Sequence, residues 1–302
     1  MRAAGWLGTW LLGICGMLVA PEVHAQDINW RGDVELRAVQ SELDADEGEE
    51  IDSSGIGANA GAGASLKVGK TTVLAVEFDL GVFDYSDNTR RTRESYSGSA
   101  TLTQKLSRNV ALELRARRAQ NIAVLEALSA DQAALGAQVA WESGKDRIRL
   151  GAEWRQHQYD TQVPGKGEGV RVEAQYNRRL GPYHWLRIDL RHEDMESKNA
   201  PVRSFERQVA RLKYSLPMSR QIRLRPSVEW RQWKYDARIA QGDPQGERRR
   251  DHYWAPALDL SWGRETRGFY GVASGEYRLR SSNDLRFGSD ALRLGLRVGY
   301  RF

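Results

Sequence analysis

The 302-residue sequence contains very little cysteine, and its single cysteine, Cys15, lies in the N-terminal segment. A disulfide framework and a thiolate zinc site are therefore excluded. The five histidines follow no metal-ligand spacing, and no serine lies in a recognisable nucleophile motif. We therefore predict no enzyme, no catalytic residue, no metal and no cofactor.

Long apolar runs are also scarce: after the N-terminal segment there is none, and the mean hydropathy is −0.62. A helical membrane protein is excluded, because each of its helices needs about 20 apolar residues. A transmembrane β-barrel is not excluded, because only alternate residues of its strands face lipid.

A strong charge imbalance is lacking as well. There are 45 basic and 40 acidic side chains, which gives a formal charge of +5. The basic residues are spread along the whole chain and do not form a focused patch. Nucleic acid is therefore not an expected partner.

The N-terminal segment has the pattern of a secretory signal peptide. Arg2 precedes an apolar run from Trp10 to Ala20, and Val23-His24-Ala25 forms a small-x-small cleavage site. Cys15 permits the alternative of a lipoprotein signal, but Ile14 is too bulky for such a site and the run continues beyond it. We predict a signal peptide over residues 1–25, cleavage near Ala25 and a barrel over residues 26–302.

The main signal in the rest of the chain is a period of two. Between Ala291 and Phe302 every second residue is apolar, and the residues between them are arginine or glycine. Successive side chains of a strand point to opposite faces, whereas a helix would mix the two sets on every face. This segment therefore predicts a strand with one apolar face.

The same alternation recurs along the chain and predicts fourteen strands, with twelve or sixteen as alternatives. Six short connections alternate with seven long ones. Short periplasmic turns, long external loops and an even strand number are typical of outer-membrane barrels. We predict an all-β fold: a closed antiparallel transmembrane β-barrel. A soluble periplasmic β-sandwich is the alternative, since it shares the alternation.

Aromatic residues gather at the ends of the predicted strands, where barrels have girdles at the membrane interfaces. The predicted periplasmic set includes Trp30, Trp141, Trp185 and Trp262. The set assigned to the outer ends is Trp154, Trp230, Trp233 and Trp254, and Tyr214 is assigned to the periplasmic girdle.

The polar face of the predicted strands is rich in arginine. An arginine facing lipid at the bilayer midplane costs about 2–4 kcal/mol, so these charges are expected to face a wet lumen. The predicted pore-lining residues are Arg115, Arg117, Arg147, Arg149, Arg171, Arg187, Arg191, Arg223, Arg225, Arg293, Arg297, Glu113, Glu173, Asp189 and Glu229. Arginine rings select anions. The alternative is that the arginines and acids pair across strands and only hold the wall together.

Two segments depart from the strand pattern. Val124, Leu125 and Leu128 would share one helical face, which predicts a loop helix within Asn121–Leu135 that folds into the lumen as a constriction. An external loop without a gating role is the alternative. The acidic run from Asp44 to Asp52 does not fit a calcium-binding loop and is interpreted as a solvated charge run.

The final segment, Val298-Gly299-Tyr300-Arg301-Phe302, resembles the C-terminal strand of bacterial outer-membrane proteins. The resemblance implies that Tyr300 and Phe302 form a membrane-insertion signal read by the barrel-assembly machinery. It also implies a location in the outer membrane of a Gram-negative bacterium, with outer-membrane lipid and lipopolysaccharide as partners.

A second resemblance covers the last quarter of the chain. Arg249-Arg250-Asp251 with Tyr253, and Ser281-Ser282-Asn283, are similar to the barrel of surface lipoprotein assembly modifiers and related polysaccharide-export barrels. Those proteins carry a tetratricopeptide domain before the barrel. Here the first predicted strand begins a few residues after the predicted cleavage site.

Three functions follow as hypotheses. The first is a porin-like channel for small charged solutes, with anions such as acidic sugars as candidates. The second is a conduit or accessory barrel that exports a polysaccharide or surface protein with periplasmic partners. The third is a structural barrel that does not conduct.

Overall fold

The structure is a computed structural model, and it describes residues 28–41, 54–88, 91–125, 128–159, 165–263, 267–288 and 290–302. The predicted signal peptide and the acidic run from Asp44 to Asp52 lie outside these ranges. In the described residues no helix is long and apolar enough to cross a membrane.

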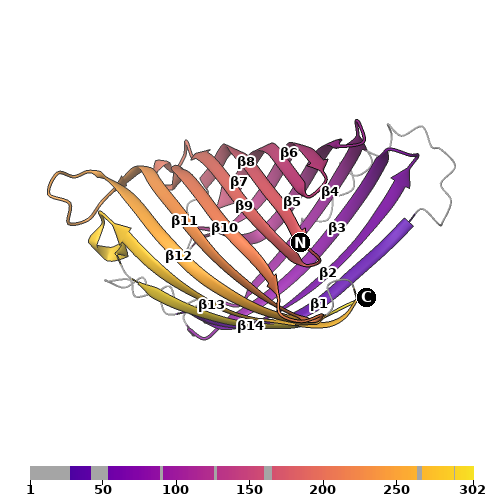
Figure 1. Cartoon of the computed structure of the whole chain (residues 1–302). Coiled ribbons are helices and arrows are strands. Elements are labelled where there is room, and N and C mark those ends of the chain that lie inside the picture. Colours follow the sequence, from indigo (N-terminus) through magenta and orange to yellow (C-terminus); the bar gives the residue numbers. More distant parts are fainter. Residues whose placement is uncertain are drawn as a thin grey trace.

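The described chain forms the fourteen predicted strands, which are joined into a single closed barrel (Figure 1). Their bounds are β1 (Ile28–Ser41), β2 (Gly55–Val68), β3 (Thr72–Tyr85), β4 (Arg93–Lys105), β5 (Val110–Leu125), β6 (Leu128–Ser143), β7 (Asp146–Tyr159), β8 (Gly165–Gly181), β9 (His184–Glu196), β10 (Phe205–Pro217), β11 (Ile222–Ile239), β12 (Arg248–Gly263), β13 (Gly268–Ser282) and β14 (Ala291–Arg301).

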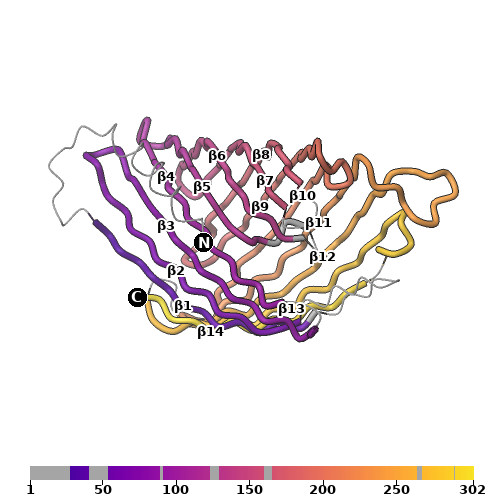
Figure 2. Tube along the Cα trace, turned by 180° about the vertical axis from the view of Figure 1, so that it is seen from behind, coloured from indigo at the N-terminus to yellow at the C-terminus, as the bar shows by residue number. Residues whose placement is uncertain are grey.

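Each strand pairs antiparallel with its neighbours in sequence, and β1 pairs with β14 to close the barrel (Figure 2). At this seam Val34 is opposite Tyr300, and the register runs on to Ser41 opposite Arg293. Beyond the last pair, Gly32 and Phe302 exchange two backbone hydrogen bonds of 3.1 and 3.0 Å. The final residue is thus part of the closure.

Apolar side chains cover the outside of the barrel. Trp30, Leu36 and Phe269 are 75%, 68% and 76% exposed, and large apolar residues at alternate positions of the other strands are exposed too. A soluble sandwich would bury one face of such strands, whereas a membrane barrel turns this face to lipid. The polar residues that alternate with them therefore line the inner face.

The connections confirm the predicted asymmetry at nearly every position. Both ends of the described chain, Ile28 and Phe302, lie at the end with the short turns. By the usual rule for these barrels, this end faces the periplasm and the other end faces the exterior. The external connections include two short 3-10 turns, η2 (Pro201–Arg203) and η3 (Leu285–Phe287).

The predicted helix within Asn121–Leu135 is wrong. β5 continues to Leu125, β6 begins at Leu128, and Ile122 pairs with Ala130. Asn121 has a positive φ of 52° and lies in a bulge of the β5–β6 register. This bulge shifts the alternation by one residue, and the shifted apolar positions imitate a helical face. The predicted constriction in this segment is therefore also wrong.

Most of the aromatic assignments hold, but two tryptophans were assigned to the wrong face. Trp233 is only 7% exposed and packs with Phe205 and Tyr235 inside the barrel. Trp185 alternates with the outward Leu186 and pairs with the buried Ser215, which places it on the inner face. Trp154 and Trp254 do lie on the outside, 42% and 53% exposed.

Candidate lumen surface

The inner face holds every residue that the sequence predicted to line a pore. Arg115 and Arg117 alternate with the exposed Leu114, and Arg293 and Arg297 alternate with exposed leucines. The same register applies to the other predicted residues, which are Arg147, Arg149, Arg171, Arg187, Arg191, Arg223, Arg225, Glu113, Glu173, Asp189 and Glu229.

Glu193 of β9 is a buried carboxylate between two arginines. Its side chain is 1% exposed, and its Oε1 accepts a 2.9 Å hydrogen bond from Arg155 of β7. Arg207 of β10 pairs with the other oxygen and also lies 4.9 Å from the centre of the Trp233 ring. Arg155 reaches over β8, where its cross-strand neighbour is Gly169, a residue without a side chain to block it.

Glu229 of β11 repeats this arrangement. Its side chain is 7% exposed and pairs with both Arg211 and Arg231. The Tyr253 hydroxyl is 3.4 Å from Glu229 Oε1, and the Arg231 guanidinium lies 4.7 Å from the Tyr253 ring centre. Like Glu193, this carboxylate has little contact with solvent.

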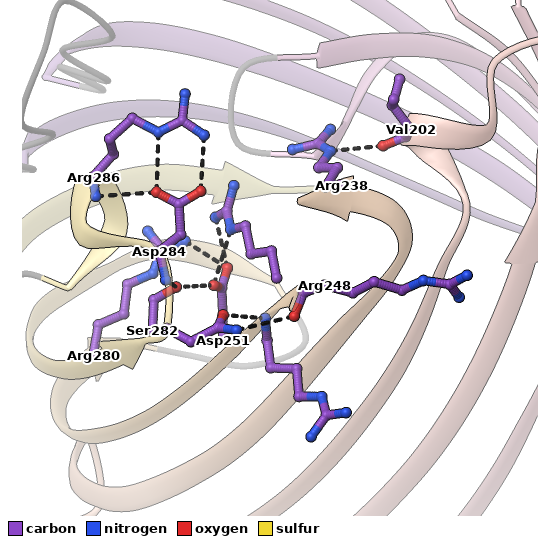
Figure 3. Close-up of polar contacts among 11 residues, drawn as sticks. Val202, Arg238, Arg248, Asp251, Arg280, Ser282, Asp284 and Arg286 are labelled. Atoms are coloured by element: carbon purple, nitrogen blue, oxygen red, sulfur yellow. Dashed lines mark hydrogen bonds and ion pairs between the residues drawn. The ribbon is translucent and has the colours of Figure 1, made fainter. Parts of the chain in front are cut away.

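Asp251 of β12 is the third such centre, at the outer end of the barrel (Figure 3). It accepts hydrogen bonds from Arg249 (2.6 Å), Arg280 (2.9 Å) and the Ser282 hydroxyl (2.7 Å). Asn283 Oδ1 accepts from the backbone N–H of Arg250 at 2.8 Å. The two segments that carry the second family resemblance are therefore hydrogen bonded to each other.

The loop that follows β13 is held by Asp284. Its carboxylate receives two hydrogen bonds from the Arg286 side chain, of 3.0 and 2.8 Å, and one of 3.1 Å from the Arg286 backbone N–H (Figure 3). Burial raises the pKa of Asp284, but the hydrogen bonds with Arg286 and Gln241 lower it to about 2. This loop residue is therefore ionised at neutral pH.

Other inner-face arginines remain accessible. The side chains of Arg115, Arg293 and Arg297 are exposed although they point into the barrel. None of the three forms an ion pair with a described residue. The interior therefore has space beside them, and the positive charge in that space is accessible.

The inner positions of β2 and β4 carry mostly small side chains. On β2 the inner positions include Gly55, Gly57, Gly61 and Gly63, and on β4 they are hydroxyl-bearing from Ser95 to Thr103. The bulky ion-pair centres lie on the opposite part of the wall, from β7 to β13. Side chains from β1 and β3, among them Arg31, Arg37 and Phe83, lie over glycines of β2.

The outer end of the inner face contains an apolar cluster of Met195, Phe205, Trp233 and Tyr235. The loop between β9 and β10 folds beside it, and Arg238 of β11 donates a 2.6 Å hydrogen bond to the Val202 carbonyl (Figure 3). Arg203 of this loop lies 4.9 Å from the centre of the Tyr159 ring. The β9–β10 loop thus contacts the outer ends of β7 and β11.

Several of these inner-face residues were missed because they lie in segments predicted as loops. Glu193 and Met195 fall in the predicted loop from His192 to Arg203, yet they continue the alternation of Asp189 and Arg191. Extending the period of two beyond the predicted strand ends would have found them. Among the described residues, no group of three or more histidine, cysteine or acidic residues is placed to hold a metal ion.

Comparisons with known proteins extend these observations. No family model matches the sequence, and no curated protein matches it. Solved structures do match. OmpT, an outer membrane protein of Vibrio cholerae, is 9% identical with a TM-score of 0.56, over 93% of this chain and 100% of its own. The outer membrane channel DcaP of Acinetobacter baumannii is 12% identical with a TM-score of 0.55, over 94% of this chain and 100% of its own.

An anion-selective porin from Comamonas acidovorans is 9% identical with a TM-score of 0.51, over 91% of this chain and 99% of that one. At such identities the likeness is one of fold. Together with the closed barrel and its exposed apolar exterior, it shows that the chain has the porin-like fold of outer-membrane β-barrels.

Proposed function

We propose that the protein is a porin-like channel for small charged solutes, with a weak preference for anions such as acidic sugars. The inner-face residues predicted from the sequence are its proposed pore lining. Fourteen strands enclose more space than the filled interior of an eight-stranded barrel and less than the aqueous channel of a sixteen-stranded one.

The observation that carries this proposal is the unequal accessibility of the inner charges. The carboxylates of Glu193, Glu229 and Asp251 are buried between arginines. Arg293 and Arg297 are exposed on the inner face. Accessible positive charge at these positions would attract anions. The alternative of a wall held by ion pairs describes β7–β13, and it is compatible with a pore beside the accessible arginines.

The experiment is the single-channel conductance and reversal potential of the refolded protein in a planar bilayer with a salt gradient. We expect a steady current with anion preference. Two charges about 8 Å apart in water interact by about 0.5 kcal/mol, so removing both Arg293 and Arg297 should lower that preference about twofold per charge at low salt.

The double variant R293Q/R297Q tests this expectation, and R118Q is the matched control. Arg118 is an exposed arginine on the outer face of β5, so its loss removes a charge without changing the lumen. An unchanged reversal potential in R293Q/R297Q would exclude a role for these arginines in selectivity. A folded barrel that carries no current would favour a structural barrel.

A second candidate is a conduit or accessory barrel for export of a polysaccharide or surface protein. The observation that favours it is the hydrogen-bonded contact between the two segments that resemble export barrels, through Asp251 with Ser282 and Arg250 with Asn283. Export predicts that deletion of the gene removes a surface product and that periplasmic partners bind near the N-terminus. Loss of solute uptake with an unchanged surface would favour the porin.

We also propose the route by which the barrel reaches the membrane. Signal peptidase would cleave near Ala25, and the barrel-assembly machinery would read Tyr300 and Phe302 on the exposed face of β14 and at its end. Outer-membrane lipid would cover the apolar exterior, and lipopolysaccharide would surround the external end. N-terminal sequencing of the outer-membrane protein tests the cleavage site.

A further inference from the structure

A cavity of about 360 Å³ lies at the short-turn end of the barrel, where β11, β12, β13 and β14 meet. Its lining includes Arg223, Arg225, Ser261, Tyr270 and Arg301. Pockets for small molecules generally have volumes of about 300–1,000 Å³, so this one is large enough for a single small solute. These five residues belong to the inner register of their strands.

The charged residues that line the cavity are all arginines. Arg223 and Arg225 come from β11 and Arg301 from β14, and among the described residues the lining contains no carboxylate. A guanidinium is charged at every physiological pH and presents a fork of N–H donors that matches a carboxylate or a phosphate. Three such groups around one small space form an arrangement suited to an oxyanion.

Aromatic rings hold two of these arginines in place. The Arg223 guanidinium lies 4.3 Å from the Tyr183 ring centre, and the Arg301 guanidinium lies 4.0 Å from that of Tyr270. Arg223 is only 4% exposed. Contact with a ring restricts the motion of the arginine side chain but does not use its N–H donors. A guanidinium that is oriented in advance loses less conformational entropy when it binds a ligand.

Two carboxylates of the surrounding strands have partners of their own. Asp259, the cross-strand neighbour of Arg225, is 3.4 Å from Lys213 Nζ, and Glu35 accepts a 3.0 Å hydrogen bond from the Tyr270 hydroxyl. The three arginines already interact within the wall. Each guanidinium has five N–H donors, however, and so has the capacity to hold a ligand as well.

We infer that this cavity is a binding site for a small solute that carries a carboxylate or phosphate, such as a sugar acid or a sugar phosphate, at the periplasmic mouth. The inference rests on the proposed function, because the site lies on the inner wall through which such a solute would pass. It adds a defined, saturable site to a general preference for anions.

The experiment is titration calorimetry of the folded barrel in detergent at low salt, with glucuronate, glucose 6-phosphate and glucose as separate ligands. We expect saturable binding of one or both anions, and the comparison shows which oxyanion is preferred. We expect no binding of glucose. In R225Q/R301Q the affinity should fall at least about tenfold, because two charge-assisted contacts are lost.

The matched control is R220Q, which removes an exposed arginine from the turn before β11, outside the cavity lining. It should bind as the unaltered protein does, and heat-modifiable migration shows that each variant is folded. Equal affinity in R225Q/R301Q and the unaltered protein would overturn the inference, as would the absence of anion binding to the unaltered protein. Anion-selective current without saturable binding would refute the binding site but not the channel. Saturable binding without current would refute the channel but not the binding site.

Discussion

Replacing Glu193 by glutamine should destabilise the barrel strongly, although it removes only one charge. The side chain keeps its shape, but Arg155 and Arg207 then face each other across a neutral amide. Their side chains are 8% and 15% exposed, so water reaches neither well. Arg155 keeps its ion pair with Glu153, so the loss falls mainly on Arg207. Breaking a buried ion pair by removing one partner typically costs about 3–5 kcal/mol.

Glu173 provides a matched comparison. It also lies between two arginines, Arg171 and Arg191, but its side chain is 44% exposed. Exposed pairs contribute about 0–1 kcal/mol, because water screens the charges and replaces the contacts. E193Q should therefore lower the free energy of unfolding by about 3 kcal/mol, and E173Q by less than about 1 kcal/mol.

The assay is urea unfolding of the barrel refolded into lipid vesicles, followed by tryptophan fluorescence. The double variant E193Q/R207Q should recover part of the loss, because it removes one of the two repelling guanidinium groups. Equal destabilisation by E193Q and E173Q would refute the reasoning, since burial would then not decide the cost. No recovery in the double variant would show that repulsion is not the cause.

Three further predictions concern packing, pH and assembly. In G299A the new Cβ would lie 2.5 Å from Tyr270 Cζ, so the Tyr270 ring must move. We expect the free energy of unfolding to fall by about 1–3 kcal/mol in the same urea assay. An unchanged unfolding midpoint would contradict this expectation. The pKa of Asp284 is lowered to about 2, so its stabilisation of the loop is complete above about pH 4 and is lost as the pH falls through 2. The protection of the Arg286 amide against hydrogen exchange should fall as the pH drops from about 4 to 2, and also in D284N. An amide that stays protected would exclude a role of Asp284 in holding the loop. Deleting Phe302 should slow assembly in cells, measured as heat-modifiable barrel after pulse labelling, and an unchanged rate would argue against a terminal signal.

The number of strands and the inner face could be predicted because both depend on a strictly local rule. Alternation assigns each residue of β14 to lipid or lumen without reference to any other strand. The rule fails where a bulge intervenes. After Asn121 the inward positions of β5 change from odd to even, so Ile122 points inward opposite Ala130 of β6.

The partners within the lumen could not be predicted from alternation. Arg155 pairs with Glu193, two strands away, because the concave wall and Gly169 between them let the side chains meet. Such contacts depend on the tilt and curvature of the closed barrel, which no single strand encodes. The cavity at Arg225 and Arg301 depends on the same geometry, since β14 meets its neighbours there only after closure.

Three inward side chains of the seam strand β1 each contact a side chain two strands away, across a glycine of the strand between them. Glu35 meets Tyr270 beyond Gly299, Arg31 pairs with Glu77 beyond Gly63, and the Arg37 guanidinium lies 4.9 Å from the Phe83 ring centre beyond Gly57.

These contacts tie β1 to β13 on one side and to β3 on the other. Parting β1 from β14 would therefore break the Glu35–Tyr270 contact as well as the backbone hydrogen bonds of the seam. A substrate that left sideways into the lipid would meet a reinforced wall at this position. On the proposed function, a solute would therefore pass along the barrel axis, from one aqueous compartment to the other.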